Sequence, residues 1–80
     1  MKEYTFQTAG PDIIARVYPT LEALGDQPWR VLLIDAIDGV EISEGSAFYE
    51  APSALQAATE AVEDWLTSQG YTNLSFAISL

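Results

Sequence analysis

The sequence has no cysteine and no histidine, and it contains only three basic residues. Without cysteine no disulfide stabilises the fold, and without either residue type a zinc site lacks its usual ligands. The commonest general base and the thiol nucleophile of enzymes are missing as well. All glycines are isolated, so no glycine-rich phosphate-binding loop is present. These absences predict a protein that is not an enzyme and that needs no cofactor and no metal ion.

Long apolar runs are missing too. No stretch approaches the roughly 20 apolar residues that cross a membrane. The N-terminal sequence MKEYTFQTAGPD is too polar for a signal peptide. We therefore expect a cytoplasmic protein without a membrane partner, located in the host cell cytoplasm if a phage encodes it.

The residues that are present describe one small folded domain. Apolar residues make up 49% of the 80 residues, which is ordinary for a globular protein. No repeat or linker divides the chain, so we expect a single domain over residues 1–80. A chain this short buries only about 60% of its unfolded surface. Partner binding, including formation of a homodimer, is therefore a reasonable source of additional stability.

Charge is the most uneven property of the chain. Twelve acidic residues stand against three basic ones, which gives a net charge of −9. No basic residue follows Arg30. The acidic residues after it are Asp35, Asp38, Glu41, Glu44, Glu50, Glu60, Glu63 and Asp64. Such a protein repels nucleic acid and is attracted to basic surfaces, so we expect a basic protein surface as the partner and no direct nucleic-acid contact.

Hydropathy patterns predict an α+β fold. A capping box at Ser53 and Gln56 begins a helix, and Gly70 suits its left-handed end. The predicted strands cover residues 3–8, 13–18, 29–37, 40–43 and 73–80. The expected order is ββββαβ, with an antiparallel sheet of four to five strands and one helix, in the C-terminal half, packed on one face. The last strand is expected beside that helix.

The predicted strand at residues 29–37 needs apolar contacts on both of its faces. Residues 31–34 are apolar on both faces, which is typical of a strand covered on two sides. One helix covers only one face of the sheet. Either the connection at residues 19–28 folds across the second face, or another chain does.

Four acidic residues flank a predicted turn and form the first candidate site: Asp35, Asp38, Glu41 and Glu44. The Asp38-Gly39 pair predicts a two-residue hairpin turn, with Ile37 opposite Val40. The acidic residues then form either a solvated loop that prevents edge aggregation or a negative surface that docks on lysines and arginines. A calcium or magnesium site is a third option, although the spacing lacks the alternation of an EF-hand loop.

The helix carries the second candidate site, which consists of Glu60, Glu63 and Asp64. Glu60 and Asp64 lie four residues apart without a neighbouring cation, so they repel each other by about a few tenths of a kcal/mol. Either this face serves solubility, or a basic partner relieves the repulsion on binding. Trp29, at the start of a strand, is a further candidate anchor for a partner.

Two segments carry a resemblance to a known group of proteins: residues 35–41, with the sequence DAIDGVE, and residues 60–64, with the sequence EAVED. With its size, acidity and layout, the chain resembles the small phage-encoded anti-CRISPR inhibitors. The likeness lies in the profile of the chain, so contact residues are not carried over. It implies a DNA mimic that blocks the lysine-lined DNA-binding surface of a CRISPR effector complex, for example a Cascade-like one.

A second likeness points to another class. The helix from Ser53 to Leu66, preceded by strands, is similar to the helix of HicB-type antitoxins. The glycine- and proline-marked entry of that family, with an aspartate before the helix region, is absent here. This resemblance implies a self-associating regulatory domain that acts through an apolar sheet face and binds a basic toxin.

Overall fold

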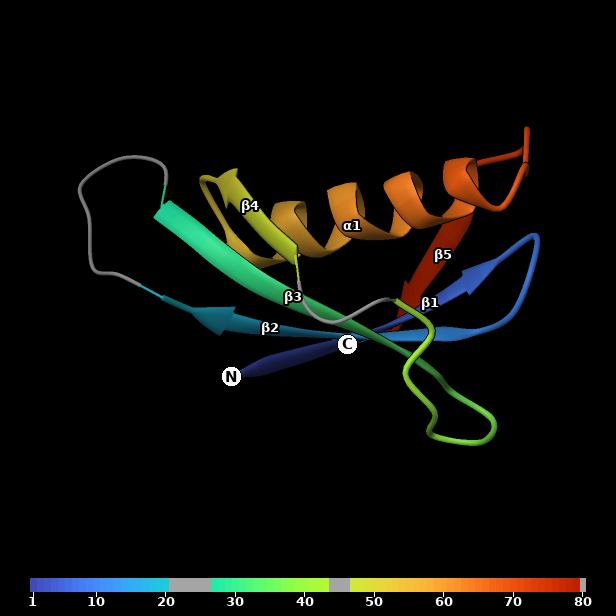
Figure 1. Cartoon of the computed structure of the whole chain (residues 1–80), viewed down its shortest axis with the longest axis horizontal. Helices are drawn as coiled ribbons and strands as arrows, with labels where there is room; N and C mark the ends of the chain where they lie inside the picture. Colours follow the sequence, from blue (N-terminus) through green and yellow to red (C-terminus); the bar gives the residue numbers. More distant parts are fainter. Residues whose placement is uncertain (21–26, 44–46, 80) are drawn as a thin grey trace.

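In the part of the chain that the structure describes, five strands form one antiparallel sheet with a helix on one face (Figure 1). The computed structural model describes residues 1–20, 27–43 and 47–79. In chain order the elements are β1 (Lys2–Thr8), β2 (Ile13–Pro19), β3 (Gln27–Asp35), β4 (Ala47–Ala51), α1 (Ala54–Ser68) and β5 (Phe76–Ser79). The predicted α+β class and the ββββαβ order are confirmed.

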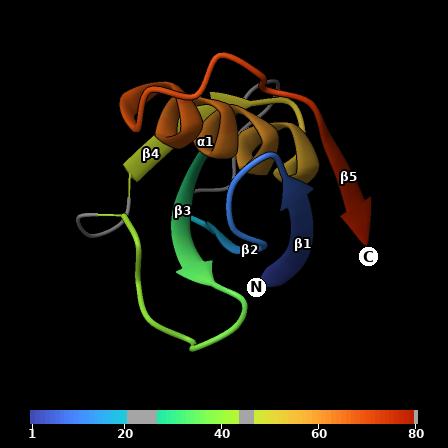
Figure 2. The same cartoon turned by 90° about the vertical axis from the view of Figure 1, so that its right-hand side faces the viewer.

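The strands are arranged in the order β4-β3-β2-β1-β5. The first four are antiparallel neighbours in sequence, whereas β5 crosses over to the far edge and pairs with β1, with Phe6 opposite Ile78. The prediction that the last strand lies beside the helix is wrong for its backbone (Figure 2), because no Cα atom of β5 lies within 8 Å of α1 among the described residues, although the Phe76 side chain packs against the core. Alternation predicted the strand itself, but it does not reveal which neighbour the strand pairs with.

The core lies between α1 and one face of β1, β2 and β3. Its buried strand residues are Phe6, Ile13, Ala15, Val17, Val31 and Leu33, with Ala51 from the end of β4. Its buried helix residues are Ala54, Ala57, Ala58, Ala61, Val62 and Leu66. Leu55 lies at helical spacing from Ala58 and Val62 but is 37% exposed. The helix instead turns its small alanines toward the sheet, which allows its backbone to approach the strands closely.

Local sequence chemistry explains where α1 begins and ends. The Ser53 hydroxyl accepts a hydrogen bond from the Gln56 N–H at 3.2 Å, as the capping box predicts. Gly70 has a φ angle of +87°, and the next N–H, that of Tyr71, donates to the Leu66 carbonyl at 3.0 Å. Both predicted helix ends are thereby confirmed.

The loop after β3 is wider than the two-residue turn that was predicted. The Asp35 N–H donates to the Val40 carbonyl, and Ile34 forms an isolated bridge with Glu41. Val40 therefore does not lie opposite Ile37, which is 87% exposed. The predicted strand at residues 40–43 is reduced to that bridge, and β4 begins only at residue 47.

Aspartate side chains account for this wider loop. The Asp35 carboxylate accepts the Ile37 N–H at 2.8 Å, and the Asp38 carboxylate accepts the Val40 N–H at 2.9 Å. Both bonds are local side-chain caps that compete with the ladder of a tight hairpin. Gly39 has a φ angle of +74°, which its lack of a side chain permits.

Candidate protein-binding site

Three carboxylates lie on the outward side of α1, and we call Glu60, Glu63 and Asp64 the acidic helix surface. Asp64 is exposed and the other two are half-exposed. In the part of the chain that the structure describes, the one ion pair joins Arg16 to Glu3. Alternation along β1 and β2 places that pair on the face of the sheet that α1 does not cover. The acidic helix surface therefore presents negative charge without a cation to neutralise it.

One member of the acidic helix surface is held by a tyrosine. The Tyr49 hydroxyl, on β4, donates to the Asp64 carboxylate at 3.0 Å. Burial, the hydrogen bond to Asp64 and the charges of Asp64 and Glu60 together raise the pKa of Tyr49 to about 12, and burial is the largest of these causes. The phenol therefore stays neutral at ordinary pH and acts as a permanent donor that orients Asp64.

A small cavity lies next to this hydrogen bond. Its volume is about 250 Å³, and its apolar walls include Val31 and Leu33 from β3 and Trp65 from α1. Tyr49 and Asp64 also line it. Pockets that enclose small-molecule ligands usually measure about 300–1,000 Å³. We therefore interpret the cavity as a gap in packing at the border of the helix, not as a substrate site.

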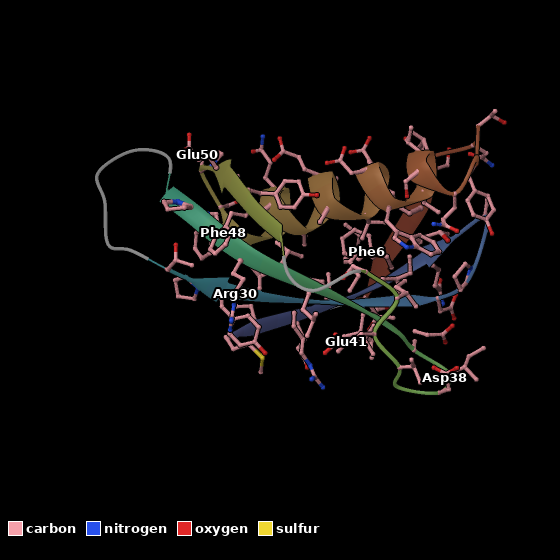
Figure 3. All side chains as sticks on the ribbon, in the orientation of Figure 1. Phe6, Arg30, Asp38, Glu41, Phe48 and Glu50 are labelled. Atoms are coloured by element: carbon pink, nitrogen blue, oxygen red, sulfur yellow. The ribbon has the colours of Figure 1, made fainter. Side chains whose placement is uncertain are left out.

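The hairpin acids do not join the acidic helix surface. The loop that carries Asp35, Asp38 and Glu41 projects from the side of the sheet opposite α1 (Figures 1 and 2). Figure 3 shows Asp38 and Glu41 on this loop, far from the helix. Glu44 lies outside the described residues. A flat basic surface would therefore contact one acidic group or the other, and the role of the hairpin acids stays a prediction.

The described residues do not form a ligand set for a metal ion. Within residues 1–20, 27–43 and 47–79, no three acidic side chains come close enough to hold a metal ion. The carboxylates of Asp35 and Asp38 accept N–H groups of their own loop, which orients them locally.

The face of the sheet that α1 leaves open carries a second surface. Phe48 is 66% exposed there, opposite Arg30 in the pairing of β3 and β4. The Arg30 guanidinium stacks 4.5 Å from the centre of the Tyr18 ring, and it points away from α1 (Figure 3). Leu32 and Ile14 add half-buried apolar area. Sequence analysis missed this cluster, because only the strand register brings Phe48, Arg30 and Tyr18 into one row.

The two-sided apolar strand predicted at residues 29–37 is confirmed in part. Val31 and Leu33 face the helix and are buried, and Ile34 is buried although it points to the other face. Residues 21–26 lie outside the described residues, so the prediction that this connection covers the second face stays untested.

Trp29, the predicted partner anchor, has a structural contact of its own. Its indole N–H donates to the Ala51 carbonyl at 2.9 Å, and its ring packs half-buried against the core. This bond ties β3 to the end of β4. A contact between Trp29 and a partner stays a prediction.

Comparisons with protein-family models, with curated proteins and with solved structures found no match. Among the described residues, no helix has the length and apolar character to cross a membrane. The geometry and charge of the molecule are therefore what a functional proposal rests on.

Proposed function

We propose that this protein is a non-enzymatic inhibitor that covers a positively charged nucleic-acid-binding surface of another protein. The observation that supports this proposal is the acidic helix surface, where Glu60, Glu63 and Asp64 face outward without a cation in a chain of net charge −9. Electrostatic complementarity of this kind steers association and selects basic partners.

The energetics of the helix fit such a role. Like charges four residues apart destabilise a helix by about a few tenths of a kcal/mol. Lysines or arginines of a partner that contact this surface offset the repulsion between Glu60 and Asp64. The helix destabilisation of the free protein is therefore relieved in the complex. Carboxylates grouped on one side of a helix also offer a basic groove the kind of charge that a phosphate backbone supplies.

The target class that we propose is a DNA-binding defence complex, as the resemblance to phage anti-CRISPR inhibitors implies. Effector complexes of this type hold their target DNA in positively charged channels. An acidic protein in such a channel competes with DNA directly. This mechanism needs no catalytic group, no cofactor and no contact between the inhibitor and nucleic acid, and it operates in the host cytoplasm.

A competition experiment tests the proposal. Binding of labelled target DNA to a purified Cascade-like effector complex is measured while the protein is titrated in. We expect the wild-type protein to displace the DNA and the double variant Glu60→Gln/Glu63→Gln to need about a tenfold higher concentration. The matched control, Asp38→Asn/Glu41→Gln, removes the same charge from the hairpin. Undisturbed DNA binding, or equal effects of the two double variants, contradicts the proposal.

A second candidate function rests on the open sheet face. A phenylalanine that is 66% exposed beside half-buried aliphatic residues favours a self-associating regulatory domain of the antitoxin type. Salt separates the two candidates, since binding to a basic partner weakens steeply as ionic strength rises, whereas an apolar interface does not.

A further inference from the structure

One edge of the sheet is free of charge. Residues 65–80, which include β5, contain no Asp, Glu, Lys or Arg in a chain that carries 12 acidic residues. Strand β5 ends the sheet order, so one side of its backbone pairs with β1 and the other has no strand beside it among the described residues. An approaching acidic strand meets less electrostatic repulsion at this edge than elsewhere on the chain.

The β5 edge is also open but well anchored. No Cα atom of β5 lies within 8 Å of α1 among the described residues, and Ala77, Ile78 and Ser79 are exposed. The strand is held in place by its pairing with β1 and by an edge-to-face contact between Phe76 and Phe6, whose ring centres are 5.1 Å apart. An edge strand with an accessible backbone is a template for β-pairing.

The opposite edge of the sheet is protected. Strand β4 carries the exposed Glu50, and Tyr49 connects it to the acidic helix surface. Charged side chains are a common device against edge-to-edge pairing. The β5 edge has no such charge, no proline and no helix over it.

We propose that two copies of this chain pair antiparallel through their β5 edges. Homotypic antiparallel pairing is isologous, so a two-fold axis perpendicular to the sheet relates the copies. The result is one continuous sheet made of two five-stranded halves. Both helices lie on the same face of this sheet, and Ile78, which is 36% exposed, meets the partner copy between them.

The uncharged β5 edge is where a second copy of this acidic chain meets the least repulsion. Two molecules of net charge −9 repel each other over most of their surfaces, and the uncharged segment from residue 65 onward brings no carboxylates into the contact. Asp64 of the acidic helix surface bonds to Tyr49 of β4, at the opposite edge of the sheet from β5, so this surface stays accessible in such a dimer. The dimer therefore does not depend on the proposed inhibitory function.

Matched charge variants test the pairing by analytical ultracentrifugation over a concentration series. Ala77→Glu places a carboxylate on the edge, and Gln7→Glu places the same charge on the same face one strand inward, since Gln7 pairs with Ala77. We expect Ala77→Glu to raise the dimer dissociation constant at least about tenfold and Gln7→Glu to change it less than about threefold. A wild-type chain that is monomeric up to about 1 mM, or equal effects of the two variants, overturns the proposal.

Single-cysteine variants locate the interface directly, because the natural chain has no cysteine. Ala77→Cys, Ile78→Cys and Ser79→Cys scan the edge, and we expect at least one to form a disulfide-linked dimer under mild oxidation. Phe48→Cys and Glu50→Cys report on the open face and on the β4 edge. Cross-linking at these two positions without cross-linking in β5 overturns the proposal and places the contact elsewhere.

Discussion

At the scale of single residues, the bond between Tyr49 and Asp64 links the core to the charged surface. The phenol is half-buried on β4, whereas the carboxylate is exposed on α1. Burial, which is the largest cause, and the neighbouring carboxylates both favour the neutral phenol, so they raise its pKa in the same direction. One hydrogen bond thus positions a member of the acidic helix surface and connects β4 to α1 beside the cavity.

This raised pKa makes stability depend on alkaline pH. The pKa of Tyr49 is 10.0 for a free side chain and about 12 in the fold. The folded state therefore binds the proton more tightly, and its contribution is complete below pH 10 and is lost as pH rises from 10 to about 12. Urea denaturation across this range is expected to show a fall in the free energy of unfolding that Tyr49→Phe reduces. Absorbance titration checks the assignment, since Asp64→Asn lowers the pKa of Tyr49 only in part.

At the scale of elements, the negative charge on α1 lowers the stability of the helix. Replacing Glu60 by glutamine removes the repulsion with Asp64 and keeps the shape of the side chain. We expect Glu60→Gln to raise the free energy of unfolding by about a few tenths of a kcal/mol at low salt. Chemical denaturation at low and high salt measures the effect. Glu50→Gln, which removes a charge outside the helix, serves as the control, and a gain of the same size there would contradict the explanation.

The elements also show what sequence can and cannot predict. The ends of α1 were predictable because Ser53 and Gly70 act through chemistry within a few residues. Strands β1, β2, β3 and β5 were predictable as alternating or β-branched runs, whereas β4 was not, because the predicted strand at residues 40–43 is reduced to one bridge. The hairpin register was not, since two aspartates bond to their own backbone and widen the loop. Nor did any local signal place β5 beside β1, because that pairing depends on the route of the chain after the helix.

The candidate site was predictable only in part for the same reason. Helical spacing predicted that Glu60, Glu63 and Asp64 share one side of α1, and they do. No spacing could show that the hairpin acids project from the opposite side of the sheet, or that Tyr49 reaches Asp64. Both facts depend on how the helix lies across the strands.

At the scale of the whole molecule, two of the three basic residues lie on the face of the sheet opposite α1, although Glu3 lies on that face too. The acidic helix surface lies on one side, while alternation along β2 and β3 places Arg16 and Arg30 on the open sheet face. Arg16 pairs with Glu3, and Arg30 stacks on Tyr18. Two copies could therefore also associate with the helix of one against the arginines of the other, a contact that would not close into a symmetric dimer.

Salt distinguishes these arrangements, because it strengthens association through an uncharged edge and weakens association between opposite charges. Between about 20 mM and 0.5 M NaCl, screening weakens the self-repulsion of a chain with net charge −9, so the melting temperature should rise. Dimerisation through the uncharged β5 edge should strengthen for the same reason, whereas binding to a basic partner should weaken. Calorimetry, ultracentrifugation and the DNA competition assay measure the three responses in the same buffers. A dimer that dissociates as salt rises would instead indicate contact between the acidic helix surface and Arg16 or Arg30, and Arg30→Gln would then abolish it while Ala77→Glu left it intact.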